Sequence, residues 1–320
     1  MSTLTVFVTD YTLAEVMDLE QEILDEVDAQ LVRAQCSTED EILAQIGDPD
    51  AIITQWAPVT RKVLSGLTKC KVVSRDGIGV DNIDLAAAKD LGIAVTNIPG
   101  YCIPEVADHA LTLSLALLRR LQPVVDTVRG GSWGVAAQIA PVRRLSELTF
   151  GIAGLGRIGR AVASRAMPFF GRLIGFDPYL PVEARASLGF DVVSREELFA
   201  QADIITLHCP LSAETRHLVC AETLALMKPG SHIVNTCRGP VVDNEALVAA
   251  LASGHLGGAG LDVHEPEPLP ADHPLRSFPN VIITPHIAYH SQESVTDARR
   301  QTAENVVLVL QGKEPHSRLV

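Results

Sequence analysis

The sequence has no long apolar run, no C-x-x-C motif and no excess of positive charge. Its most apolar stretch, residues 110–118, lies between His109 and Arg119 and is too short to span a bilayer. The formal net charge of −13 argues against a general nucleic-acid binder and against a protein that binds anionic membranes. We therefore expect neither a nucleic acid nor a membrane as a partner, while a local basic pocket for an anion remains compatible with this charge.

The cysteines are scattered, which favours reduced thiols in a cytosolic protein and gives no spacing typical of a metal site. The chain begins with Met-Ser-Thr and enters a predicted strand at once, so we expect no signal peptide. These features predict a cytoplasmic location and no bound metal. The six cysteines are Cys36, Cys70, Cys102, Cys209, Cys220 and Cys237.

What the sequence does contain is a glycine fingerprint, G-x-G-x-x-G, in the context of a strand, a turn and a helix. Gly154 permits the tight turn, Gly156 lets backbone amides approach a pyrophosphate, and Gly159 lets the helix pack closely on the strand. A second apolar strand ends at Asp177, where an acid can bind the ribose hydroxyls. The alternative is a glycine-rich turn with a surface aspartate, but the combination favours a dinucleotide site.

A length of 320 residues allows about two domains, and 47% hydrophobic with 20% charged residues is ordinary for a globular chain. The first hundred residues alternate strand and helix signals, which predicts a parallel sheet covered on both faces. They carry no glycine fingerprint, so we interpret residues 1–99 as a separate substrate domain. The predicted strands are 4–8, 29–34, 51–54, 71–74 and 93–96, and the predicted helices are 12–26, 38–46, 60–67 and 83–91.

A second strand–helix series follows from Thr149, and we assign residues 100–286 to the dinucleotide-binding domain. Its six strands with crossovers predict a doubly wound sheet in an α/β fold. The final amphipathic helix, residues 291–310, is expected to return to the first domain with the rest of 287–320. The predicted strands are 149–153, 173–176, 203–207, 232–235, 258–263 and 281–284, with a short piece at 190–193 and helices at 157–170, 221–227 and 244–253.

A long helix is predicted over residues 104–121, with Pro104 at its start and Arg119 and Arg120 at its end. Its apolar face is wide, and we interpret that face as too large to be hidden on one side of one sheet. The helix therefore predicts a homodimer interface. Trp133, in the stretch that follows, is interpreted as a packing residue.

Five blocks of sequence resemble the NAD-dependent D-isomer-specific 2-hydroxyacid dehydrogenases, and the resemblance covers almost the whole chain. It is nearest to the branch that contains the C-terminal-binding-protein corepressors and phosphoglycerate-dehydrogenase-like enzymes. It implies NAD as cofactor and a Rossmann-type domain beside a smaller flavodoxin-like α/β substrate domain. The blocks are Gly77–Asn82, Asn97–Ala110, the fingerprint with Asp177, Asn235–Gly239, and Leu261–Pro268 with Thr284–His286.

The resemblance also implies three catalytic residues. Arg238 follows a strand, at the edge where open α/β sheets bind ligands, and a guanidinium can hold a carboxylate and a keto oxygen together. His286 is then the proton carrier, and Glu267 is the carboxylate that orients it and favours its charged form. We interpret Glu265 as a loop carboxylate. His264, His273 and His290 are interpreted as ordinary surface or core histidines.

Further contacts are implied in the same way. Backbone amides of Ile78 and Gly79 are expected to hold the substrate carboxylate, and Arg75 and Tyr101 are candidates for contacting the other end of the substrate. Asp262 resembles the acid that binds the nicotinamide carboxamide. The implied cofactor-binding residues are Gly154, Gly156, Arg157, Ile158, Gly159, Asp177, His208, Pro210, Thr215, Cys237 and Asp262.

The resemblance predicts an enzyme that interconverts a small anionic 2-oxo acid and a D-2-hydroxy acid. Asp177 has no cation beside it to bind the extra phosphate of NADP, so we expect a preference for NAD. Two alternatives are open: an NAD(H)-sensing, corepressor-like scaffold, and a phosphite dehydrogenase. The presence of Arg238, Glu267 and His286 favours the 2-hydroxyacid enzyme over the scaffold.

Overall fold

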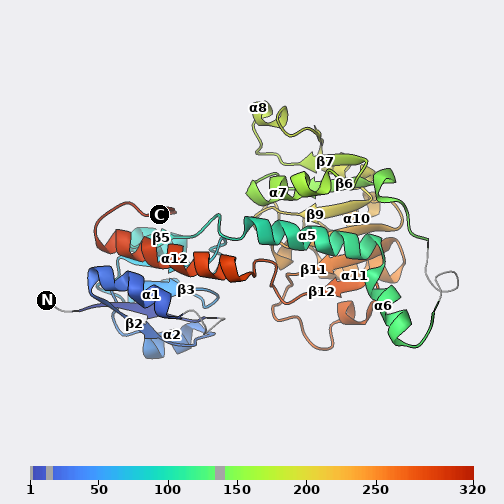
Figure 1. Ribbon diagram of the computed structural model, residues 1–320. Helices are drawn as coiled ribbons and strands as arrows, with labels where there is room; N and C mark the ends of the chain where they lie inside the picture. The colour runs from blue at the N-terminus through green and yellow to red at the C-terminus, as the bar shows by residue number, and fades with distance from the viewer. Residues whose placement is uncertain (1–2, 12–16, 134–140) are drawn as a thin grey trace. The chain divides into compact units, whose positions relative to one another are not determined.

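The computed structural model describes residues 3–11, 17–133 and 141–320. The chain divides into two compact units (Figure 1). Unit 1 contains residues 1–101 and 291–320, and unit 2 contains residues 102–290.

Unit 1 is a five-stranded parallel sheet in the order β2-β1-β3-β4-β5, which is the flavodoxin-like order. Its strands are β1 (Leu4–Val8), β2 (Ala29–Arg33), β3 (Ala51–Thr54), β4 (Val72–Arg75) and β5 (Ala94–Thr96). Its α-helices are α1 (Met17–Leu24), α2 (Glu39–Gln45), α3 (Arg61–Ser65), α4 (Leu85–Leu91) and α12 (Gln292–Leu310). The predicted helix over residues 12–26 lies partly outside the described residues.

The two faces of this sheet are buried by different helices, as strand alternation requires. Phe7 of β1 packs with residues of α2, α3 and α4, whereas Val6 and Val8 pack with Leu24 of α1 and Val306 of α12. Figure 1 shows α12 (red) beside α1 (blue). The C-terminal helix therefore completes the core of the sheet that the N-terminal residues build.

Unit 2 is a seven-stranded parallel sheet in the order β12-β11-β10-β9-β6-β7-β8. This is a doubly wound sheet, and its order reverses between β6 and β9. The α/β fold class is thus confirmed. The strands are β6 (Thr149–Ala153), β7 (Arg172–Phe176), β8 (Asp191–Val192), β9 (Ile204–Leu207), β10 (Ser231–Asn235), β11 (Leu256–Leu261) and β12 (Val281–Ile283).

The helices of unit 2 include three, α6, α8 and α9, that were not predicted from the sequence. The short piece near residue 191 pairs with β7 as β8, and α9 follows it with a capping box formed by Ser194 and Glu197. That S-x-x-E signal was readable from the sequence. The α-helices are α5 (Ile103–Leu118), α6 (Leu121–Arg129), α7 (Arg157–Ala166), α8 (Val182–Arg185), α9 (Arg195–Gln201), α10 (Ala221–Leu226) and α11 (Asn244–Ala252).

The long helix is shorter than predicted, and its apolar face is buried inside its own unit. The helix α5 ends at Leu118, Arg120 takes a left-handed conformation (φ 50°), and α6 begins at Leu121. A Cβ on Gly260 of β11 would lie 3.1 Å from Leu113 Cβ, so the missing side chain lets α5 lie close to the sheet. The argument for a dimer from this face was therefore wrong. Trp133 is 89% exposed, so it does not pack within the described chain.

No helix among the described residues is long and apolar enough to cross a membrane. Within the same residues, no group of three or more histidine, cysteine, aspartate or glutamate side chains is arranged to hold a metal ion.

Candidate active site

The turn between β6 and α7 contains the three glycines of the fingerprint. Two of them lie too close to other backbone atoms to carry a side chain, and the third faces open space. Gly154 has φ 91°, and a Cβ there would lie 2.7 Å from the carbonyl carbon of His208. A Cβ on Gly159 would lie 1.9 Å from the carbonyl oxygen of Gly154. At Gly156, which caps the N-terminus of α7, a Cβ would have no described atom within 4 Å. The turn thus leaves room for a phosphate at the positive end of the helix dipole.

Asp177 lies immediately after β7 and is held beside this turn. Its Oδ2 accepts a hydrogen bond of 2.9 Å from the Leu155 amide, and its Oδ1 accepts one of 2.9 Å from the Tyr179 amide. The carboxylate is only half-buried. The Asp177 carboxylate is therefore fixed at the end of the second strand of the fingerprint, where it can accept hydrogen bonds from a ribose.

The loop after β9 lies at the point where the strand order reverses, and it contains His208, Pro210 and Thr215. The His208 amide donates to the Ala153 carbonyl at 2.7 Å, and its Nε2 lies 2.9 Å from Thr206 Oγ1. Burial lowers the pKa of His208 to about 3, so its ring is neutral near pH 7. Thr215 closes the loop by donating to the Pro210 carbonyl at 2.6 Å.

Three more predicted cofactor residues of unit 2 follow β6 and β10. Arg157 and Ile158 are the first residues of α7, exposed and half-buried respectively. Cys237 follows β10, and its amide and its thiol both donate to Asn235 Oδ1, at 3.0 Å and 3.1 Å. Burial raises the pKa of the Cys237 thiol well above its usual range. The glycine turn, Asp177 and these loops together fit a bound dinucleotide.

The predicted catalytic residues follow three strands that are neighbours in the sheet. Arg238 comes after β10, Glu267 after β11 and His286 after β12. The first two loops touch directly, because a Cβ on Gly239 would lie 1.9 Å from the carbonyl oxygen of His264. Parallel strands present their carboxyl ends at one edge, so the fold gathers these residues at that edge.

Glu267 and His286 are in direct contact. Glu267 Oε2 lies 2.9 Å from His286 Nδ1, and Oε1 accepts a hydrogen bond of 2.7 Å from the His264 amide. Burial alone would raise the pKa of Glu267, but its interactions with His286 and His264 together hold that pKa below its usual range. The ionised carboxylate accepts a hydrogen bond from Nδ1–H of His286, which orients the ring.

Arg238 and Glu265 are held by separate contacts. Arg238 Nη1 donates to the Cys237 carbonyl at 2.7 Å, and the Arg238 carbonyl accepts from Asn235 Nδ2 at 2.8 Å. Glu265, the other acid of the same loop as Glu267, pairs with Arg216 at 3.3 Å. The two glutamates therefore have different partners.

Asp262 is completely buried and builds the turn that carries His286. Its Oδ1 accepts from the Thr284 hydroxyl at 2.5 Å and from the Ile287 amide at 3.0 Å, and its Oδ2 accepts from the Ala288 amide at 2.9 Å. Its backbone carbonyl accepts from the His286 amide at 2.7 Å. A contact between Asp262 and the nicotinamide carboxamide stays a prediction.

The predicted substrate residues lie in unit 1. The Ile78 carbonyl accepts a hydrogen bond of 2.7 Å from Asn97 Nδ2, and Ile78, Gly79 and Tyr101 are half-buried. Arg75 is 7% exposed, with its guanidinium 5.5 Å from the centre of the Trp56 ring and Nη1 donating to the Asp76 carbonyl. The Arg75 side chain is thus folded against its own loop.

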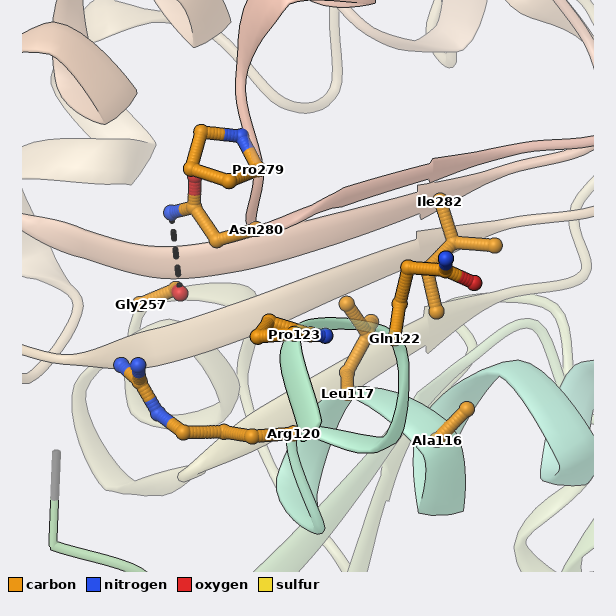
Figure 2. Close-up of a pocket in the computed structure, with 9 residues that line it drawn as sticks. All are labelled: Ala116, Leu117, Arg120, Gln122, Pro123, Gly257, Pro279, Asn280 and Ile282. Atoms are coloured by element: carbon orange, nitrogen blue, oxygen red, sulfur yellow. Dashed lines mark hydrogen bonds between the residues drawn. The ribbon is translucent and has the colours of Figure 1, made fainter. Parts of the chain in front are cut away.

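Figure 2 shows a pocket of unit 2. Its residues Gly257 and Asn280 lie at the amino ends of β11 and β12, whereas the predicted catalytic residues follow the carboxyl ends of strands. Asn280, which precedes β12, donates to the Gly257 carbonyl at 3.0 Å on one of its walls. None of the predicted site residues lines it. Its lining residues are Ala116, Leu117, Arg120, Gln122, Pro123, Gly257, Pro279, Asn280 and Ile282.

Two residues next to the catalytic loop were not singled out from the sequence. His109 in α5 and Thr284 after β12 lie 3.1 Å apart, Nε2 to Oγ1, although 175 positions separate them. Both fell inside the blocks that carry the family resemblance. A single histidine in an apolar helix gives no signal that distinguishes it from an ordinary core histidine.

Proteins similar to this chain are known over most of its length. Residues 111–288 match the model of the D-isomer specific 2-hydroxyacid dehydrogenase, NAD binding domain. A D-3-phosphoglycerate dehydrogenase of Methanocaldococcus jannaschii is 40% identical over 278 residues, which are 86% of this chain and 52% of that protein. A glyoxylate reductase of Korarchaeum cryptofilum is 38% identical over 279 residues, 86% of this chain and 83% of that protein.

Among solved structures, D-lactate dehydrogenase from Aquifex aeolicus, complexed with NAD and lactic acid, is 30% identical, with a TM-score of 0.86 and 96% of each chain covered. The chain spans about half the length of the phosphoglycerate dehydrogenases that it matches. From its family match and its dinucleotide-binding turn, the chain belongs to the D-isomer specific 2-hydroxyacid dehydrogenase family, with NAD as its cofactor.

Proposed function

We propose that this chain catalyses hydride transfer between NAD(H) and a small 2-oxo acid or D-2-hydroxy acid. The observation that carries the proposal is the contact of 2.9 Å between Glu267 and His286, on the loops beside Arg238. A histidine oriented by an ionised carboxylate is suited to transfer a proton near neutral pH. The comparisons favour neither a corepressor-like scaffold nor a phosphite dehydrogenase, since the matching relatives are named for reactions of 2-hydroxy acids.

In this proposal the nicotinamide supplies the hydride, and the protein binds and polarises the substrate. Arg238 binds the substrate carboxylate and the keto oxygen in one plane, which a guanidinium does better than an ammonium. The Ile78 and Gly79 amides bind the carboxylate as well. These contacts fix the reacting carbon and draw charge toward the keto oxygen.

His286 completes the reduction by giving its Nε2 proton to the oxygen of the former carbonyl. Glu267 accepts from Nδ1 and stabilises the imidazolium that exists before this transfer. In the reverse direction, neutral His286 removes the proton of the hydroxyl group. Asp177 binds the ribose hydroxyls, and its charge disfavours a cofactor with a 2′-phosphate.

We further propose that unit 1 binds substrate, that unit 2 binds NAD, and that the enzyme is a cytoplasmic homodimer. Support for a dimer comes from apolar side chains at and after α6, since Leu121 is 55%, Val128 47% and Trp133 89% exposed. Exposed apolar side chains of this size can mark an interface between proteins when they form one patch.

The test is a panel of 2-oxo acids with NADH: glyoxylate, hydroxypyruvate, pyruvate, phenylpyruvate and phosphohydroxypyruvate. We expect at least one to be reduced, and its product to be the D-isomer. Arg238→Ala should raise KM and lower kcat, because the residue acts in both ground and transition states. Arg216→Ala, at the arginine that pairs with Glu265, is the matched control. The proposal is wrong if NADH binds but no acid of the panel is reduced.

A further inference from the structure

Thr284, two residues before His286, is held by histidines at its side-chain oxygen and at its backbone oxygen. His109 Nε2 lies 3.1 Å from Thr284 Oγ1, and His264 Nε2 lies 3.3 Å from the Thr284 carbonyl oxygen. The Thr284 hydroxyl also contacts the fully buried Asp262 at 2.5 Å. A chain of contacts therefore runs from α5 to the loop that carries the proposed proton donor.

The direction of these hydrogen bonds follows from counting protons. A carboxylate only accepts, and Asp262 also receives two backbone amides, so the single hydroxyl proton of Thr284 goes to Asp262. His109 must then be the donor to Thr284, with a proton on Nε2. The same nitrogen lies 3.6 Å from Asp262 Oδ1, so its N–H also faces the buried charge.

The loop needs such support because His286 has φ 53°, in the left-handed region that is rare for residues other than glycine. A non-glycine residue stays there only when its surroundings fix it. Asp262 does so through its carbonyl, which accepts the His286 amide, and through its carboxylate, which accepts the next two amides. Buried carboxylates need donors around them to remain in place.

We propose that His109 is a positioning residue for His286, acting through Thr284 and Asp262. Its Nε2–H orients the Thr284 hydroxyl toward Asp262, and Asp262 then fixes the backbone from which the His286 ring reaches Glu267. The inference rests on the proposed role of His286 as proton donor. His109 itself is held on α5, a helix that contacts β11 and β12.

The experiment compares His109→Leu, which removes the donor, with His109→Gln, which keeps an N–H of similar reach. With the oxo acid that the wild type reduces best, we expect His109→Leu to lower kcat by about 10- to 100-fold, the range of a small misplacement of a catalytic group. KM and the Kd for NADH should change little, and His109→Gln should recover most of the rate. His255→Gln is the control, at a histidine whose ring contacts the Leu224 carbonyl, away from the catalytic loops.

A double-mutant cycle separates this role from a general loss of packing. Thr284→Val keeps the shape but removes the hydroxyl, and Thr284→Ser restores it. Because both residues act along one chain of contacts, the His109→Leu/Thr284→Val variant should be no slower than the slower single variant. Additive losses, or a His109→Leu enzyme with normal kcat, would overturn the inference. If His109→Leu does not fold, the variants Thr284→Val, Thr284→Ser and His109→Gln still test the proposed chain of contacts.

Failure of this inference is distinguishable from failure of the proposed function. If His286→Ala retains activity, the proton-donor role is wrong. If His286→Ala is inactive while His109→Leu is normal, only the role of His109 is wrong. Spectra of protein labelled with ¹⁵N-histidine give a readout without turnover: the His286 Nδ1–H signal should shift or broaden in His109→Leu and return in His109→Gln. An unchanged His286 signal in His109→Leu would contradict the proposal.

Discussion

Glu267 uses one carboxylate oxygen to hold His286 Nδ1 at 2.9 Å and the other to hold the His264 amide at 2.7 Å. The carboxylate therefore connects the side chain of the proposed proton donor to the backbone of the neighbouring loop. The interactions with His286 and His264 together lower the pKa of Glu267 despite burial, so Glu267 is ionised near pH 7.

Replacing Glu267 with Gln should shift the pH dependence of reduction rather than only scale it. The amide keeps the shape but removes the charge that stabilises the imidazolium, so the basic limb of the kcat profile should move to lower pH. The variant should lose most rate at neutral and high pH and recover part of it in acid. His286→Ala should lose about 10²- to 10⁴-fold at every pH, without recovery in acid.

The control for this prediction is Glu265→Gln, at the acid that pairs with Arg216 instead of His286. Its profile should match the wild type. A Glu267→Gln profile that is lower but unshifted would show that Glu267 is not coupled to the proton donor.

Cofactor choice should depend on Asp177. The wild type should prefer NADH to NADPH in kcat/KM, and Asp177→Ser should reduce that preference by about 10-fold or more, a change of ~1.4 kcal/mol. The physical reason is the removal of a negative charge next to the site of the 2′-phosphate. Steady-state kinetics with both cofactors check this, and a wild type that uses NADPH equally well would refute the assignment.

Two glycines of one turn should respond differently to alanine. A Cβ at Gly159 would lie 1.9 Å from the Gly154 carbonyl oxygen, so Gly159→Ala should lower Tm, since overpacking typically costs about 1–3 kcal/mol. At Gly156 the space is open within the described structure, so Gly156→Ala should keep the Tm and weaken NADH binding instead. Thermal melts and NADH fluorescence titrations measure the two effects. Equal effects of both substitutions on NADH affinity and on Tm would argue against separate roles.

Stability in acid should depend on His208. Burial lowers its pKa from 6.5 to about 3, so between these values the unfolded state binds the proton more readily. The contribution of a neutral His208 to stability is therefore present above about pH 6.5 and is lost as the pH falls toward 3. His208→Gln cannot be protonated, so the drop in Tm between pH 7.5 and pH 5 should be smaller than in the wild type. An identical drop in both proteins would contradict this.

Assembly is predicted from α6 rather than from α5, whose apolar face is buried within unit 2. Light scattering at micromolar concentration should give the mass of a dimer. Leu121→Asp places a charge at a residue that is 55% exposed and should favour the monomer without lowering the stability of the fold. Leu226→Asp, at a leucine of α10 that is 45% exposed, is the matched control. A monomeric wild type would refute the dimer.

The sequence by itself determined the order and type of most elements, because strand alternation, helix periodicity and caps are local signals. Thr38 caps α2 and Ser291 caps α12, and these are the first residues of two helices that the sequence predicted. The glycine fingerprint with Asp177 could also be recognised from the sequence, because each glycine is required by the steric constraints of one local turn. The fold class, the family and the cofactor followed from these local patterns.

Only the tertiary structure decided contacts between segments that are distant in the sequence. Gly258 and Gly260 of β11 make room for Leu117 of α5, and this close packing buries an apolar face that had suggested an interface. His109 contacts Thr284, which is 175 positions away in the sequence, because α5 lies against β12. No local pattern carries such information, because the free energy of a hydrogen bond or a buried side chain depends on what the fold places beside it.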